Sequence, residues 1–259
     1  MLQAPPRTAL SGPALIRLLA RLADVDVPES RQSLSDRLSQ WLGWTDAIAL
    51  SSVLNGNPPA VSAGTRVFGS AEESEYVRAR SSLAKTITGD SVFAADRRRG
   101  PARASAHAPL QSAPAEPAAD YAVFRQRYLS IQQSMEMAIG NLRGRLRGML
   151  ATRTPAMARL AVVDAVMERA LSERERNLLA SIPALLAGHF ERLRAAEQAA
   201  LAAAEASDET AGDADSNAAA LTAGAWLNVF RKDMQSVLLA ELDIRLQPVE
   251  GLLAALRAS

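Results

Sequence analysis

Residues 121–150 read YAVFRQRYLSIQQSMEMAIGNLRGRLRGML, and their apolar positions decide the fold class. From Tyr121 to Leu142 these positions alternate between steps of three and four residues, and they are Tyr121, Phe124, Tyr128, Ile131, Met135, Ala138 and Leu142. This is the heptad spacing of a helix that packs along one side against other helices. After one phase shift the pattern continues through Leu146 and Met149 or Leu150. One long helix is therefore predicted over about 120–152.

Two further long helices are predicted downstream of this seam. Pro155 should open the second, because proline favours the first helical turn, and Pro183 should kink it by removing a backbone donor. The predicted elements are a helix over about 155–206, an acidic loop over 207–217 and a helix over about 218–259. Short connections make neighbouring helices antiparallel, so residues 120–259 are predicted to form an elongated antiparallel three-helix coiled coil or bundle.

The first half of the chain is predicted to be organised differently. Apolar spacing indicates short helices in a small N-terminal helical module over residues 1–55, with Trp41 and Trp44 expected in its core. Residues 56–119 form a linker in this prediction, since much of the segment has too little apolar periodicity for a packed core. One helix is expected within it near 70–88, where a capping-box pair opens a helical pattern. The predicted class is all-α, with disordered linkers and no strand.

Composition excludes several classes of protein. The chain of 259 residues has 29 basic and 28 acidic side chains, and this balance argues against a strongly basic nucleic-acid coat protein. The absence of cysteine excludes disulfides and thiolate chemistry, and two histidines leave little material for a metal centre. No apolar run approaches the roughly 20 residues of a spanning helix, and the first apolar stretch has no cleavage-like site. We therefore expect a protein of the cytoplasm.

No arrangement of residues in the sequence indicates catalysis. Ser82 and Lys85 have the spacing of a Ser–Lys nucleophile, but the pattern is short and no partner motif accompanies it. His189 has no second histidine in helical register, and no glycine-rich phosphate-binding motif is found. We expect a protein that is not an enzyme, with no catalytic residue, no metal site and no cofactor.

One segment of the predicted long helix is strongly basic. Between Tyr121 and Val163 there are seven arginines and one acidic residue, and glycine recurs every four residues within the same helix. Each glycine costs about 1 kcal/mol relative to alanine, so the helix gives up stability at these positions. The residues of this predicted binding strip, the Arg/Gly strip, are Arg125, Arg127, Gly140, Arg143, Gly144, Arg145, Arg147, Gly148 and Arg153.

Two interpretations of the Arg/Gly strip are open. In the first, the glycines allow two helices to pack closely while the arginine stems flank the apolar seam. In the second, the strip binds the phosphate backbone of DNA or an acidic helix of a partner protein. Any such DNA contact would be independent of base sequence, because no aromatic platform or base-reading helix accompanies the strip.

Three segments resemble an uncharacterised bacterial family, described as a domain of unknown function. They are Pro28-Glu-Ser-Arg-Gln-Ser33, Gln40-Trp-Leu-Gly-Trp-Thr-Asp-Ala-Ile48 and Arg245-Leu-Gln-Pro-Val-Glu-Gly-Leu-Leu253. The resemblance covers most of the chain outside the two low-complexity linkers. Members of this family look like accessory components encoded beside a MotA-like proton channel and an OmpA-like peptidoglycan-binding protein. That grouping resembles one subtype of the Zorya antiphage defence systems, and it implies no catalytic residue.

The resemblance and the Arg/Gly strip together predict a non-enzymatic component of an antiphage defence system. Its expected partners are another protein of the same system and double-stranded DNA, with an indirect link to an inner-membrane proton-driven motor. The alternative is a purely structural coiled-coil scaffold or adaptor that does not bind nucleic acid. A hydrolase using Ser82 and Lys85 is a third class with less support. The apolar seam could close within one chain or recruit a second copy, so a homo-oligomer stays open.

Overall fold

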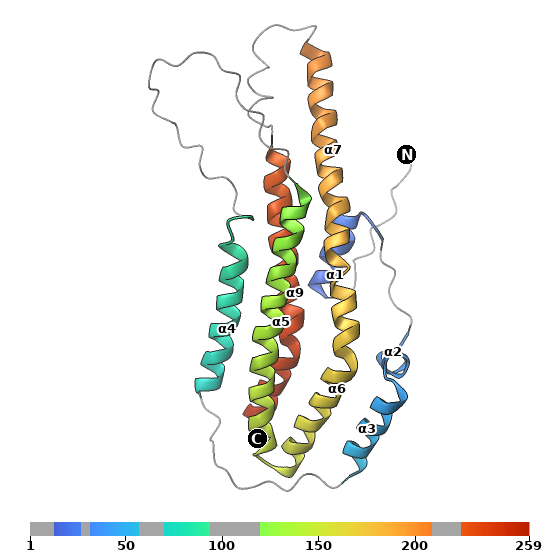
Figure 1. Cartoon of the computed structure of the whole chain (residues 1–259), viewed down its shortest axis with the longest axis vertical. Coiled ribbons are helices and arrows are strands. Elements are labelled where there is room, and N and C mark those ends of the chain that lie inside the picture. The colour runs from blue at the N-terminus through green and yellow to red at the C-terminus, as the bar shows by residue number, and fades with distance from the viewer. Residues whose placement is uncertain (1–12, 27–31, 57–69, 94–119, 209–223, 259) are drawn as a thin grey trace, which may run out of the picture.

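The computed structural model describes residues 13–26, 32–56, 70–93, 120–208 and 224–258 (Figure 1). Every regular element in these ranges is an α-helix, which confirms the predicted all-α class. The helices are α1 (Ala14–Ala23), α2 (Leu34–Trp41), α3 (Trp44–Asn55), α4 (Ser70–Thr88), α5 (Tyr121–Ala151), α6 (Pro155–Leu179), α7 (Ile182–Asp208) and α9 (Ala225–Arg257). Within the described ranges, no helix combines the length and apolar character needed to cross a membrane.

The long helices lie side by side along most of the molecule (Figure 1). α5 contacts both α9 and α6, and α9 also contacts α7. The predicted seam is the buried side of α5, where Tyr128, Met135 and Leu150 have no exposed surface. α9 faces this seam with its own buried stripe, in which Phe230 and Met234 are completely enclosed. Removal of these two apolar stripes from water stabilises the assembly of the helices.

The connection between α5 and α6 is a tight turn. α5 ends at Ala151, and the Thr154 side chain starts α6 by accepting a hydrogen bond from the Met157 amide at 3.2 Å. Pro155 occupies the first turn of α6, where a helix needs no amide donor from it. The tight turn makes α5 and α6 direct neighbours, and one side of α5 therefore faces α6 along its length.

The segment predicted as one kinked helix is divided into two helices. α6 ends at Leu179 and α7 begins at Ile182, so the interruption precedes Pro183. Pro183 lies in the first turn of α7, where its missing amide hydrogen breaks no helical bond. Pro248 behaves differently, because α9 runs through it without interruption.

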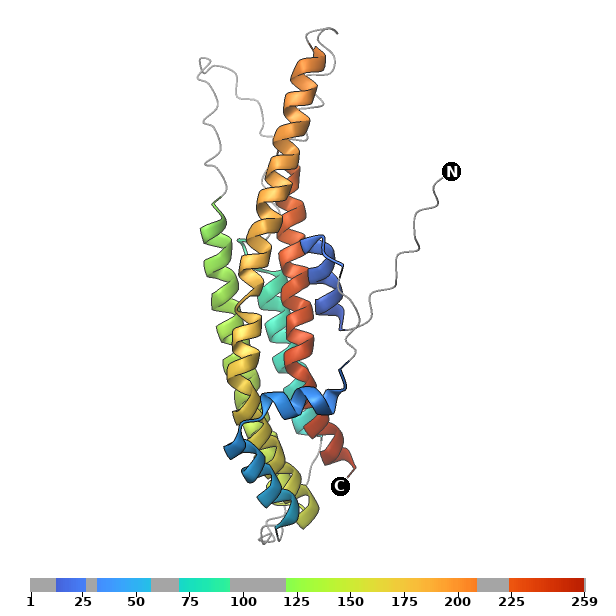
Figure 2. The same cartoon turned by 90° about the vertical axis from the view of Figure 1, so that its right-hand side faces the viewer.

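The helices of the first 55 residues contact different long helices. α1 packs on α7 and α9, whereas α3 packs on α6, and α1, α2 and α3 lie on the same side of the molecule (Figure 2). Trp44 is 81% exposed, so the expectation that it lies in a core is wrong. No residue of α3 is buried, because this helix covers the outside of α6. Trp41 is half-buried, and the Arg174 guanidinium lies 4.9 Å from its ring centroid.

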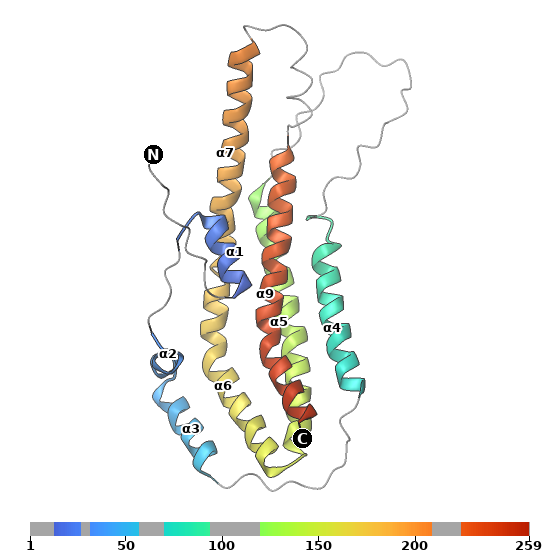
Figure 3. The same cartoon turned by 180° about the vertical axis from the view of Figure 1, so that it is seen from behind.

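α4 matches the helix predicted near 70–88, and it contacts α5 and α9. Seen from behind, α1 and α4 stand on either side of α9 (Figure 3). Leu83 and Ile87 of α4 are buried in the core. Residues 57–69 and 94–119 of the predicted linker, and residues 209–217 of the acidic loop, lie outside the described residues.

Candidate functional site

Two arginines of the Arg/Gly strip are bonded to the acidic side of α6. The Arg143 guanidinium makes a bidentate contact with Asp164, at 3.0 Å from Nε to Oδ2 and 2.7 Å from Nη2 to Oδ1. Arg147 donates from Nη1 to Asp164 at 3.1 Å and to Glu168 at 2.5 Å. Burial lowers the pKa of Arg143, but its bonds to Asp164 outweigh this effect and the pKa is raised overall. Both guanidinium groups therefore form ion pairs that link α5 to α6 within the chain.

Two further arginines of the strip connect α5 to α4 and the turn that follows it. Arg127 donates from Nε to Asp90 at 2.5 Å, and the Asp90 side chain is only 4% exposed. Arg145 is paired with Glu75 of α4, with 60% of its side chain exposed. The fold thus brings carboxylates from two separate segments to the basic helix.

The remaining arginines of the strip are placed differently. Arg125 is exposed, and no carboxylate within the described ranges pairs with it. Arg153 is half-buried, and its Nε atom has no hydrogen-bond partner among the residues that the structure describes. The strip is therefore neutralised along most of its length and leaves Arg125 and Arg153 at its two ends.

The glycines of the strip are not helix–helix contacts within this chain. Apart from the adjoining residues and backbone of α5 itself, a Cβ atom built at Gly140, Gly144 or Gly148 would meet no atom of the described chain within 4 Å. Gly140 and Gly148 are exposed, and Gly144 is partly exposed. Close packing at glycine, the first of the two interpretations, is therefore wrong for these positions among the helices that the structure describes.

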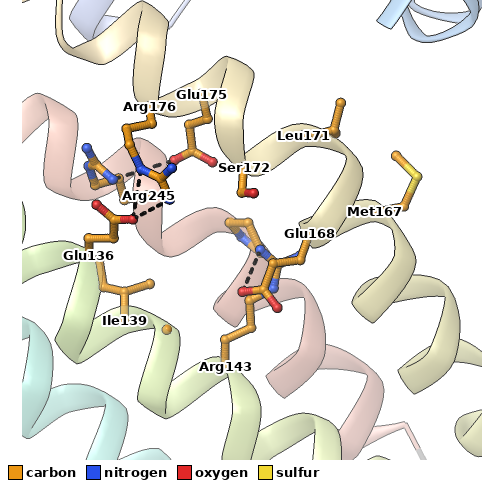
Figure 4. A pocket seen from close by; sticks show the side chains of 12 residues that line it. Glu136, Ile139, Arg143, Met167, Glu168, Leu171, Ser172, Glu175, Arg176 and Arg245 are labelled. Carbon is orange, nitrogen blue, oxygen red and sulfur yellow. Dashed lines mark hydrogen bonds and ion pairs between the residues drawn. The ribbon is translucent and has the colours of Figure 1, made fainter. Parts of the chain in front are cut away.

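A cavity of about 430 Å³ lies beside Gly140, between α5, α6 and α9 (Figure 4). Its charged lining residues belong to ion pairs that cross between helices. Arg176 pairs with Glu136 at 3.0 Å, and Arg245 lies 3.8 Å from Glu175. The other charged residues of the lining are Arg143 and Glu168, whose separation is 3.6 Å. With as many acids as bases, the cavity offers no excess charge of either sign to a ligand.

A completely buried carboxylate lies next to this cavity. Glu241 of α9 has no exposed surface and accepts hydrogen bonds from the Tyr128 hydroxyl at 2.7 Å and from Gln132 Nε2 at 2.9 Å. Arg245 donates to it from Nε at 2.8 Å. Gln132 also donates to the Leu179 carbonyl at 3.2 Å, at the end of α6. Burial first, and then the charge of Glu241, raises the pKa of Tyr128 well above its usual value.

This buried network, formed by Tyr128, Gln132, Glu241 and Arg245, was missed at the sequence level. The apolar spacing predicts the Tyr128 ring in the seam but says nothing about its hydroxyl group. Glu241 and Arg245 are four residues apart and lie among the leucines of α9, a spacing at which opposite charges meet on one helix face. That signal was available, because a buried charge needs a partner. The network can fix the register of α5, α6 and α9, since the buried Glu241 carboxylate accepts from three donors and Gln132 also bonds the end of α6.

The residues considered for catalysis do not form a reactive cluster. Ser82 and Lys85 are both exposed on α4. His189 is bonded through Nε2 to Asp233 at 2.9 Å, and its ring contacts that of Phe230. Across the described ranges, no group of three or more histidine, aspartate or glutamate residues is arranged to hold a metal ion.

A family model described as "Protein of unknown function (DUF3348)" matches residues 1–258. No curated protein and no solved structure matches the chain. The match extends over the exposed α3, the break between α6 and α7 and the buried network alike, so the family covers every element of the fold.

Proposed function

We propose that this chain, which belongs to the DUF3348 family of proteins of unknown function, is a non-enzymatic helical adaptor that binds a partner protein without binding DNA. The adaptor would be a cytoplasmic component of an antiphage defence system. The defence role and the partner protein come from the first function predicted from the sequence, and the absence of DNA binding comes from the second. The pairing of the arginines favours the second function on this point.

The observation that carries this proposal is the bonding of Arg143 and Arg147 to Asp164 and Glu168. A phosphate backbone would have to take these guanidinium groups from their carboxylates. The Asp164 side chain is 13% exposed, so its charge would lose its partners in a poorly solvated place. Such an exchange is costly, whereas the existing pairs already stabilise the contact between α5 and α6.

A protein partner is supported by the apolar side chains that the fold leaves exposed. Leu178 is 60% exposed and Val25 is 56% exposed, and both border the same apolar groove beside α1. Contiguous exposed apolar surface of this kind is typical of protein–protein contacts. The role in antiphage defence rests on the resemblance of the three quoted segments to accessory components of Zorya systems. Through that resemblance the partner is another protein of the system, with an indirect link to the envelope motor.

Two measurements on the full chain test the proposal. In the first, the tagged chain is co-expressed with the products of its neighbouring genes, and we expect it to purify as a complex with at least one of them. In the second, binding of a labelled DNA duplex is measured between about 50 and 200 mM salt, where phosphate contacts lose affinity steeply. We expect no salt-dependent binding, and an Arg125→Ala variant should behave as the unchanged chain does. A complex with none of the gene products, or tight and salt-sensitive DNA binding, would overturn the proposal.

A further inference from the structure

An apolar groove of about 590 Å³ runs between α1 and the junction of α6 and α7. Its lining includes Ile16 and Leu19 of α1, Leu178 of α6, Leu185 of α7 and Ile244 of α9. Ile16 is 41% exposed, Leu178 60% and Leu185 44%, although all three are large aliphatic side chains. α1 contacts α7 and α9, and Figure 2 shows it next to α9 at the outer side of the molecule, where a partner can approach.

The length and direction of the groove follow from α1. This helix has 10 residues and is therefore about 15 Å long, which corresponds to about three helical turns. The C-terminal end of α1 lies beside Arg192 of α7, because the Arg192 guanidinium donates to the Leu22 carbonyl. The beginning of α1 lies toward the end of α6, where Glu175 joins the lining. A helix of about three turns therefore fits alongside α1.

The charged side chains next to the groove differ in sign between its ends and its sides. Glu175 lines the end near α6, and 47% of its side chain is exposed although Arg245 lies 3.8 Å away. Asp24 and Asp26 flank the exposed Val25 at the other end, where the α1 carbonyls add negative partial charge. The Arg192 guanidinium nearby is bonded to the Leu22 carbonyl. Asp24 and Asp26 outnumber Arg192 at one end, and at the other Glu175 shares the single charge of Arg245 with the buried Glu241. Acidic groups are therefore in excess at both ends.

The arginines of α1 do not compensate this charge. Arg17 and Arg21 are exposed and lie about 100° further round the helix than Ile16 and Ala20, which line the groove. The groove thus offers an apolar centre with carboxylates at its ends.

We propose that this groove binds an amphipathic helix of the partner protein, apolar on one face over about three turns and basic at both ends. The inference rests on the proposed function, because it specifies where the adaptor holds its partner. The apolar face of the incoming helix covers Ile16, Leu178 and Leu185, while lysine or arginine side chains at its ends lie near Glu175 and Asp24.

The test uses the full chain and two labelled synthetic peptides of about 16 residues, long enough for four helical turns. Both carry leucine at positions i, i+4, i+7 and i+11. One has lysines at its two ends and the other has glutamates there. We expect the lysine peptide to bind at least about tenfold more tightly at low salt, and the difference to shrink as salt screens the charges.

Matched variants locate the binding. A Leu178→Glu, Leu185→Glu double variant should weaken binding of the lysine peptide by about tenfold or more, since it places charge on the apolar lining. A Val77→Glu variant is the control, because Val77 is 57% exposed on α4 and lies outside the groove lining. Thermal unfolding of each variant verifies that it is folded. An Asp24→Asn, Glu175→Gln variant should reduce the preference for the lysine peptide to less than about threefold.

Absence of peptide binding, equal binding of both peptides, or binding that survives the double variant would each overturn the inference. The proposed function has its own readout, which is co-purification with a neighbouring gene product. A complex that persists with the Leu178→Glu, Leu185→Glu chain overturns the groove assignment and leaves the adaptor function standing. Failure of the unchanged chain to form any complex overturns the function itself, whatever the peptides do.

Discussion

The Tyr128 hydroxyl of α5 donates a hydrogen bond to the Glu241 carboxylate of α9 across 2.7 Å, and neither residue has any exposed surface. Because Gln132 and Arg245 also donate to Glu241, three donors surround one buried charge. This arrangement connects α5 to α9 by a polar contact inside an otherwise apolar seam. It also makes the first prediction possible, since one donor can be removed while the ring stays in place.

A Tyr128→Phe substitution should destabilise the protein by about 1–3 kcal/mol, the cost of leaving a buried charged acceptor with one donor fewer. The change in the free energy of unfolding can be measured by urea denaturation. Tyr76→Phe is the control, because the Tyr76 hydroxyl bonds to Glu250 in an exposed setting. If both variants lost the same small amount, the bond between Tyr128 and Glu241 would have no special weight.

Asp164→Asn should loosen the contact between α5 and α6. The substitution takes the charge from a carboxylate that serves both Arg143 and Arg147, and about 1–3 kcal/mol of stability should be lost. Arg145→Ala provides the comparison, because the exposed pair of Arg145 with Glu75 should contribute less than about 1 kcal/mol. Unfolding curves of the two variants decide the point. Equal effects would mean that the pairs with α6 are no more important than a surface pair.

The glycines of α5 predict a gain in stability. Gly144→Ala adds a methyl group that meets no atom of another described segment within 4 Å, so the helix should gain about 0.5–1 kcal/mol from alanine's higher helix propensity. The thermal unfolding midpoint is the measurement. A loss of stability would show that the methyl group meets something in solution, such as a second copy of the chain.

The tyrosines predict that stability declines at alkaline pH. Burial, and then Glu250, raises the pKa of Tyr76 to about 12, and burial raises the pKa of Tyr121 to about 12. The pKa of Tyr128 is raised well above its usual value by burial and by Glu241. In the unfolded chain a tyrosine has a pKa of about 10, so unfolding releases protons above that pH. Stability is therefore complete below about pH 10 and is lost as pH rises toward the folded values.

The chain contains three tyrosines, and this makes the alkaline prediction direct to measure. The near-ultraviolet absorbance of tyrosinate in the folded protein should show no group ionising near pH 10. Titration in strong denaturant should bring all of them back to about pH 10. A tyrosine that ionises at its ordinary pKa in the folded chain would contradict the raised pKa values expected of these hydroxyl groups.

The long helices could be predicted because their signal is local. The seam from Tyr121 to Leu150 has a period that only a helix satisfies, and α5 begins and ends within one residue of the predicted bounds. The break before Pro183 was placed less accurately. Proline marks where a helix can restart, but which residues separate the two helices depends on packing against the neighbours.

The arginine partners could not be predicted, because they come from other helices. The basic segment was counted as far as Val163, and Asp164, which neutralises two of its arginines, is the next residue. Residues on either side of the turn between α5 and α6 are close in sequence and pair with each other in the fold. A charge summed along one segment cannot reveal such a pairing. The prediction that Trp44 lies in a core was wrong for a related reason. An apolar pattern predicts a helix, but it does not predict whether another part of the chain covers that helix.

The break between α6 and α7 also has a mechanical consequence. α7 has 27 residues, about 40 Å of helix, and its far end extends beyond the ends of α5 and α9 (Figure 1). A force on the projecting end of α7 is resisted first where α7 packs on α1 and α9 and where Glu197 accepts a hydrogen bond from the Gly224 amide at 2.6 Å. Only beyond these contacts does it reach the joint at Ala180 and Ser181. At this joint the Leu179 carbonyl is attached to Gln132, which in turn holds Glu241. A change in the angle between α6 and α7 at this joint would therefore act directly on the hydrogen bonds that hold the buried Glu241.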